Sequence, residues 1–167
     1  MRIVRRQKEG FCAIMLLKII SGAQTGVDRA ALDAALELGI PHGGWVPKGR
    51  KAEDGIIPEK YKMMEMPTER YAGRTERNIL DSDGTLIISR GALTEGSDLT
   101  RQLAIKHARP WLHTDLHRIG ATEAARTIHA WLERHGISVL NVAGPRASKD
   151  PGIYSLTRDI LKRVINE

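Results

Sequence analysis

The sequence predicts one α/β domain, with three layers in a Rossmann-like arrangement. Short apolar runs alternate along the chain with stretches that carry an amphipathic helix pattern, and several of the runs end in polar, Gly-rich turns. Strands that alternate with helices favour a mainly parallel sheet, here of about five or more strands, covered by helices on both faces. At 167 residues, the chain is long enough to bury a sizeable core as a single domain.

Each apolar run has the length of a buried strand. The expected strands are 17–21, 44–46, 85–89, 110–113 and 138–142, of which 44–46 carries the weakest pattern. The segment 47–67 contains three prolines and shows no clean period, so we expect it to be a long loop, which in a small domain is usually functional or mobile.

The helices are predicted from apolar stripes and from their end signals. Thr25 is the expected N-cap of a first helix, with Asp28 three residues later, and Gly39 is the expected stop. Further helices are expected from near Ser97, over 122–135 before Gly136, and from Tyr154 almost to the end. The apolar stripe of the first helix consists of Val27, Ala30, Ala31, Ala34 and Leu38.

The net charge of +6 is unevenly spread. Arg2, Arg5, Arg6 and Lys8, set against Glu9, supply half of it within the first fourteen residues. The rest of the chain suits a local anion site better than a phosphate-tracking surface, and only 4% of the residues are aromatic. These features argue against a nucleic-acid partner.

The first fourteen residues are expected to form a mobile basic tail or an upstream extension, and 15–167 the ligand-binding domain. No run approaches the length of a membrane span, so no membrane partner is expected. Cys12 is the only cysteine, which excludes disulfides within the chain and Cys-based metal sites. We therefore expect a cytoplasmic protein.

Two Gly-rich turns each lead into a helix. In "SGAQTG" (21–26), the free amides of Thr25 to Asp28 are expected to face an anion, although Asp28 already places a carboxylate in the first turn. In "SRGALTEGSDLT" (89–100), glycines and the hydroxyls of Thr94, Ser97 and Thr100 repeat the arrangement. Neither turn is a dinucleotide fingerprint or a Walker loop, but two such helix starts together favour a ligand contact.

Two further segments complete the expected site. "NVAGPR" (141–146) follows the last strand and offers Arg146 to an anion or, equally, to solvent. In "YAGRTERN" (71–78), helical spacing places four polar residues on one stripe, which is either a solvated face or one edge of the site. These four residues are Tyr71, Arg74, Thr75 and Asn78.

Three segments together resemble the molybdenum carrier (molybdenum cofactor carrier-like) family, which is related to the lysine-decarboxylase-like (LOG) Rossmannoid proteins. They are "SGAQTGVDRAALDAALELGIPHGGWVPKGRKAEDG", "RTERNILDSDGTLIISRGALTEGSDLT" and "VLNVAGPRASKDPGIY". The resemblance implies a Rossmann-like fold, a phosphorylated nucleotide-like or pterin-type ligand with molybdenum cofactor (molybdopterin) as cargo, and a homo-oligomer, either a dimer or a tetramer. The ligand loops that it implies are Gly22, Gln24, Thr25 and Gly26, then Thr94, Gly96, Ser97 and Thr100, then Gly144 and Arg146.

This sequence departs from the family pattern at two places. Glu95 stands where a second glycine is expected, and "LTRQLA" lacks the glutamate that the related phosphoribohydrolases carry after their Gly-rich loop. Glu95 adds a negative charge near the expected anion site, so its side chain either swings outward or reduces ligand affinity. The missing glutamate favours a binder, carrier or sensor over an enzyme. In this hypothesis a pterin-like ring lies against the loop that carries Trp45 and Lys48, and no metal is coordinated directly because a molybdenum cofactor brings its own metal ligands. Gly26→Asp is expected to abolish binding while leaving the fold intact.

The alternative is a LOG-like phosphoribohydrolase, which would cleave the N-glycosidic bond of a nucleoside monophosphate. Glu95 or Asp98 would then act as general acid or base, and Arg74 would position the phosphate. In either case Arg74 and Asn78 would contact the ligand from the polar stripe.

Overall fold

The sheet has five parallel strands in the order β2-β1-β9-β7-β8. The computed structural model describes residues 14–166, so the expected tail, apart from Ile14, and Cys12 lie outside the described residues. Four of the five expected strands overlap strands of this sheet. The expected strand 44–46 instead overlaps β3 (Trp45–Val46), which pairs outside this sheet, and the fifth strand of the sheet lies just before it. The strands are β1 (Lys18–Ile20), β2 (His42–Gly43), β7 (Gly84–Ser89), β8 (Trp111–Asp115) and β9 (Val139–Ala143).

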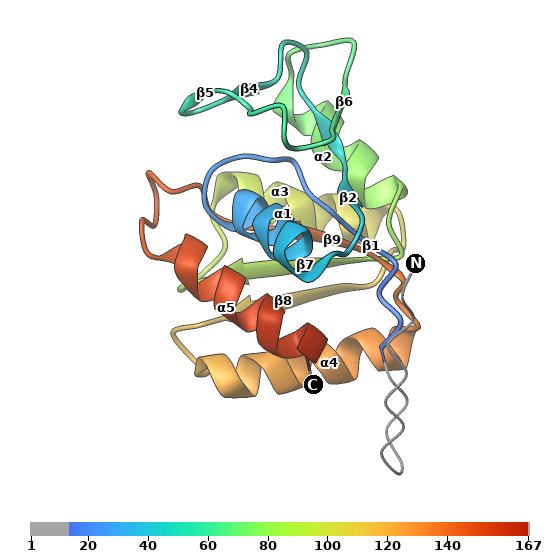
Figure 1. The fold of residues 1–167 in the computed structure, drawn as a ribbon, viewed down its shortest axis with the longest axis vertical. Coiled ribbons are helices and arrows are strands. Elements are labelled where there is room, and N and C mark those ends of the chain that lie inside the picture. The colour runs from blue at the N-terminus through green and yellow to red at the C-terminus, as the bar shows by residue number, and fades with distance from the viewer. Residues whose placement is uncertain (1–13, 167) are drawn as a thin grey trace.

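Helices cover both faces of this sheet, which confirms the predicted three layers (Figure 1). Leu86 and Ile88 of β7 join the core with α1, α4 and α5, whereas Ile87 between them points to the other face, on the side of α2 and α3. The helices are α1 (Val27–Leu38), α2 (Tyr71–Leu80), α3 (Glu95–Lys106), α4 (Ala121–His135) and α5 (Ile153–Asn166).

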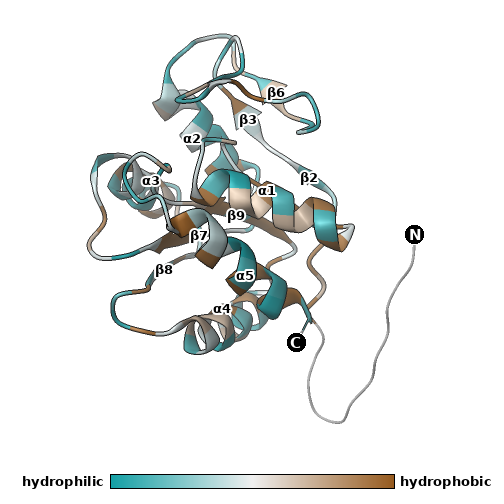
Figure 2. Ribbon diagram, turned by 60° about the vertical axis from the view of Figure 1, so that its left-hand side comes forward, coloured by the Kyte–Doolittle hydropathy of each residue, from teal (hydrophilic) through white to brown (hydrophobic). Residues whose placement is uncertain are grey.

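Hydrophobic residues gather where these helices meet the sheet (Figure 2). Gly39 and Gly136 end α1 and α4 in the left-handed conformation, with φ of 67° and 58°, as the sequence indicates. Within residues 14–166, no helix combines the length and the apolar character that crossing a membrane requires.

The 47–67 segment contains more structure than the expected loop. It carries an antiparallel hairpin of β4 (Lys51–Ala52) and β5 (Gly55–Ile56), and β6 (Met64–Glu65), which pairs in parallel with β3 (Trp45–Val46). The Asp33 carboxylate on α1 accepts hydrogen bonds from the hydroxyls of Tyr61, at 2.6 Å, and Tyr154, at 2.5 Å. This carboxylate therefore joins the segment to both α1 and α5.

The carboxyl ends of β1, β9 and β7 lie side by side because the three strands are parallel neighbours. After β1 the chain enters α1 on one face of the sheet, and after β7 it enters α3 on the other face. The helices that follow β1 and β7, the two strands beside β9, lie on opposite faces of the sheet and leave a crevice between their N-termini. Ligands bind in such crevices in open α/β sheets. In this fold, the crevice lies over the end of β9.

Candidate functional site

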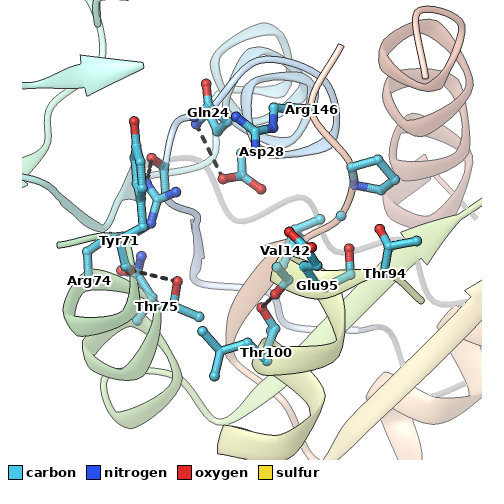
Figure 3. A pocket seen from close by; sticks show the side chains of 18 of the residues that line it. Gln24, Asp28, Tyr71, Arg74, Thr75, Thr94, Glu95, Thr100, Val142 and Arg146 are labelled. Carbon is cyan, nitrogen blue, oxygen red and sulfur yellow. Dashed lines mark hydrogen bonds between the residues drawn. The ribbon is translucent and has the colours of Figure 1, made fainter. Parts of the chain in front are cut away.

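A cavity of about 720 Å³ occupies this crevice. The wall from α2 carries Tyr71 and Arg74, and the opposite wall is the first turn of α3 (Figure 3). The loop after β1 and the turn after β9 complete the lining. Of the expected site residues, the cavity brings together Gly22, Gln24, Arg74, Asn78, Thr94, Glu95, Gly96, Ser97, Thr100, Gly144 and Arg146.

The N-terminus of α3 faces the cavity without an internal cap. Thr94, the N-cap residue, is extended, and its side chain makes no capping hydrogen bond. The first amide to find a helical acceptor is that of Asp98, which donates to the carbonyl oxygen of Thr94 at 2.9 Å. The three preceding N–H groups, of Glu95, Gly96 and Ser97, belong to the turn that lines the cavity. Such amides carry the positive end of the helix dipole and suit an anion.

The start of α1 differs from the expectation, because two of the four amides from Thr25 to Asp28 already have acceptors within the protein. The amide of Thr25 donates to Gln24 Oε1 at 3.1 Å, and that of Val27 donates to the carbonyl oxygen of Pro145 at 3.2 Å. For Thr25 and Val27, the prediction that the amide is free for an anion is therefore wrong.

Gly26, not Thr25, is the N-cap residue of α1, with φ of 80°, so the predicted Thr25 cap is wrong. Its left-handed φ and missing Cβ let the Pro145 carbonyl approach the helix end closely. The Thr25 hydroxyl donates to Glu53 and accepts the amide of Ala147 at 3.0 Å. Thr25 and Gly26 thus hold α1 against the turn after β9 and do not line the cavity.

Asp28 and Arg74 are buried charged residues that line the cavity, 7% and 8% exposed. Burial raises the pKa of Asp28 to about 6, although Arg74, Arg29 and the backbone N–H groups of Gln24 and Gly22 oppose that shift. Burial also lowers the pKa of Arg74 from its usual value. The Arg74 guanidinium donates to the carbonyl oxygen of Gly22 and lies 5.2 Å from the centre of the Tyr71 ring.

Two cationic side chains come from the turn after β9. Arg146 is 46% exposed, and its Nε lies 3.9 Å from Glu53 Oε2 at the tip of the β4–β5 hairpin. Lys149 also lines the cavity and forms no ion pair with any residue in the described range 14–166. Glu53 is held in turn by the Ser148 amide at 3.1 Å and the Ser148 hydroxyl at 2.5 Å.

Trp45 and Lys48, expected beside a ring, are absent from the lining. The Trp45 indole N–H donates to Asp81 Oδ2 at 2.7 Å, and Arg77 covers the ring at 5.3 Å. Asn78 fixes this strand to α2, because its amide accepts from the Trp45 N–H at 2.7 Å and donates to the Trp45 carbonyl at 3.1 Å.

Asp98 also lies outside the lining, since Arg101 at 2.8 Å and Gln102 at 2.6 Å hold its carboxylate on the outer side of α3. Glu95 does line the cavity. The described residues contain no group of three His, Cys, Asp or Glu side chains that could hold a metal ion.

Several lining residues were not among the expected ligand residues. Tyr71 and Thr75 belong to the polar stripe that predicted Arg74 and Asn78, and Lys149 follows "NVAGPR", so the sequence did carry a signal for these three. Asp28 was expected only as a helix-capping residue and as a reason against phosphate. Asn141 begins the expected segment "NVAGPR" but was not named as a ligand residue, because its burial within β9, with its side-chain amide donating to Thr85 Oγ1 at 3.2 Å, depends on strand pairing.

The model of the circularly permuted YpsA SLOG family matches residues 19–165. The chain belongs to this family. Its YpsA-type domain is also similar to a crystal structure from Syntrophus aciditrophicus, described as a "Putative molybdenum carrier protein", with 57% sequence identity and a TM-score of 0.90. The alignment covers 90% of this chain and 96% of the other. No curated protein matches the chain.

Proposed function

We propose that this YpsA-type protein binds a small phosphorylated ring compound in the cavity and carries it without chemical change. The observation that carries the proposal is the uncapped first turn of α3, whose N–H groups face the cavity across from Arg74. Arg146 and Lys149 add positive charge at the same cavity. Helix amides and flexible cations together suit a phosphate group.

The similar protein from S. aciditrophicus is described as a "Putative molybdenum carrier protein", which supports a molybdenum-related cargo. The cargo in this proposal is the molybdenum cofactor, a pterin phosphate that brings its own metal ligands. A cavity of about 720 Å³ lies in the size range of sites for small ligands and cofactors. In this proposal the protein is a cytoplasmic homo-oligomer, a dimer or a tetramer, whose ligand contacts are the expected residues that line the cavity.

Native mass spectrometry of the purified protein tests the cargo and the oligomer together. A bound molybdopterin mass supports the carrier function, and thermal-shift screening of pterin phosphates and nucleoside monophosphates then ranks the ligands. Failure of every phosphorylated ring compound to raise the melting temperature would contradict the proposal.

Gly96 allows a sharp test of the phosphate position. A Cβ at Gly96 meets no atom within 4 Å, so substitutions there are tolerated sterically. Gly96→Asp would place a carboxylate beside the free amides and is expected to abolish phosphate binding, whereas Gly96→Ala is the matched control and is expected to bind as the wild type does. Equal binding by both variants would remove α3 from the site.

Glu95 supports a second candidate, the phosphoribohydrolase, because this carboxylate lines the cavity. Water would add to the sugar carbon as the C–N glycosidic bond breaks, giving ribose 5-phosphate and the free base. Release of base from a nucleoside monophosphate, lost in Glu95→Gln, would establish this activity. The absence of turnover over a panel of nucleotides favours the carrier.

A further inference from the structure

Asp28 carries an inference about the ring of the ligand, which rests on the proposed function. Its carboxylate is buried, yet it lines the cavity and points into the space between α2 and α3 (Figure 3). The amide of Gln24 reaches Oδ2 at 3.3 Å, and the backbone N–H of Gly22 also acts on this carboxylate. No ion pair holds the carboxylate in the described part of the chain. Two carboxylate oxygens offer about four acceptor positions, so hydrogen-bonding capacity remains for a ligand.

The chemistry of such a group favours a ligand that supplies N–H donors. A buried carboxylate lacks the hydration that water would give it, and donors from a ligand replace that hydration. Because its two oxygens can each accept one hydrogen bond, a carboxylate pairs best with two adjacent N–H groups. A ring nitrogen bearing hydrogen, next to an exocyclic amine, provides that pair.

Tyr71 supplies a flat surface for the same ring. Its side chain is 46% exposed and lines the cavity. The guanidinium of Arg74 lies 5.2 Å from the ring centre, which helps to fix the orientation of the Tyr71 ring. The Trp45 indole, whose N–H donates to Asp81, does not line the cavity and cannot serve this purpose.

We propose that Asp28 accepts two hydrogen bonds from the 2-amino-4-oxopyrimidine edge of the ligand, while Tyr71 stacks on the ring. Pterins and guanine share this edge, and adenine and hypoxanthine lack it. The first turn of α3 faces the phosphate, so the ring edge and the phosphate are recognised by different walls of one cavity.

Isothermal titration with matched ligands tests this assignment. GMP and IMP differ only in the 2-amino group, which IMP replaces by hydrogen. Neopterin monophosphate and its lumazine counterpart differ in the same position, where the lumazine carries an oxo group in place of the amine. We expect the 2-amino member of at least one pair to bind about tenfold more tightly than its partner. The pair that shows the preference distinguishes a guanine nucleotide from a pterin as the source of the edge.

Asp28→Asn is the decisive variant, because it keeps the shape of the side chain and one acceptor oxygen. It is expected to reduce the tenfold preference to about twofold or less. Asp98→Asn is the matched control, a first-turn aspartate outside the cavity, and is expected to keep the full preference. Tyr71→Ala is expected to weaken both members of the pair about fivefold, and Tyr71→Phe to retain binding.

The possible failures are distinguishable. If the phosphorylated ligands bind and respond to Gly96→Asp but show no 2-amino preference, the assignment of Asp28 is overturned and the proposed function stands. An unchanged preference in Asp28→Asn overturns it equally, provided that circular dichroism shows the variant to be folded. If no member of either pair binds, both the assignment and the proposed function fail.

Discussion

Asp28 and Arg74 act on opposite sides of one short peptide segment. The Arg74 guanidinium donates to the carbonyl oxygen of Gly22, while the Asp28 carboxylate accepts the amide of Gln24 at 3.3 Å. A Cβ at Gly22 would lie 2.6 Å from Arg74 Cζ, so the close approach requires glycine. Two buried charges thus fix the conformation of the loop after β1 and remain at the cavity wall.

Asp28→Asn is expected to stabilise the protein at neutral pH. The folded state raises the pKa of Asp28 from 3.8 to about 6, so folding favours the protonated form. The stabilisation that the protonated Asp28 gives to the folded state is complete below about pH 4 and is lost as pH rises through about 6. One unit of pKa corresponds to about 1.4 kcal/mol, so the ionised carboxylate lowers the free energy of unfolding by roughly 3 kcal/mol at pH 8. This figure is an upper limit for the gain in Asp28→Asn, because Asn has one acceptor oxygen fewer.

Urea denaturation of both proteins across this pH range measures the effect. The free energy of unfolding of the variant should exceed that of the wild type at about pH 8, and the two should converge near about pH 4. The comparison isolates position 28, because both proteins keep the other charged groups near it. These groups are Arg74, Arg29 and the cavity-lining Glu95, Arg146 and Lys149. A difference that does not change with pH would contradict the raised pKa. A residue that destabilises the fold at neutral pH is typical of a functional site.

Arg74→Ala is expected to lower the free energy of unfolding by about 2 kcal/mol. It removes the donor to the Gly22 carbonyl and leaves Asp28 without its largest favourable charge. Arg77→Ala on the same helix is the control, because Arg77 is half-exposed and should cost only about 0.5 kcal/mol. Equal losses in the two variants would show that Arg74 is not a structural anchor of the loop.

Gly26→Ala is expected to destabilise the protein by more than about 2 kcal/mol, because it combines a positive φ with a Cβ that collides with the Pro145 carbonyl. Gly39→Ala is the control, since Gly39 also has a positive φ but a Cβ there meets no atom within 4 Å, and it should cost about 1 kcal/mol. Thermal denaturation ranks the two. The sequence-based expectation that Gly26→Asp leaves the fold intact is wrong for the same steric reason.

Glu53→Gln is expected to strengthen phosphate binding about two- to threefold at low salt, because it removes the negative charge 3.9 Å from Arg146. The Ser148 and Thr25 hydrogen bonds hold the pKa of Glu53 below its usual value, so the charge is present at neutral pH. Titration at two salt concentrations should show the gain shrinking as salt rises. Glu69→Gln, which loses only the partner of Lys51, should bind as the wild type does.

The fold was predictable because local patterns determine it. The apolar runs and the glycine stops at Gly39 and Gly136 mark the elements, and the rule that parallel strands align their carboxyl ends brings the loops around Gly22, Thr94 and Arg146 to one cavity.

The remaining features depend on contacts between distant segments, which no local pattern carries. The Thr25 hydroxyl donates its hydrogen bond to Glu53. The Trp45 indole donates to Asp81 and is covered by Arg77. The orientation of Asp28 into the cavity depends on the loop conformation that Arg74 imposes from α2. The sequence therefore indicated which segments meet, but not which atoms they leave free.

The position of β9 makes the cavity a late product of protein synthesis. This strand lies between β1 and β7, yet residues 139–143 leave the ribosome more than a hundred residues after β1. Until then, the pairs β2–β1 and β7–β8 have no strand to join them, and the site lacks Val142, Gly144 and Arg146. Non-local pairing of this kind slows folding. A chain that has not yet inserted β9 cannot assemble this cavity, so the cavity forms only after nearly the whole domain has been synthesised.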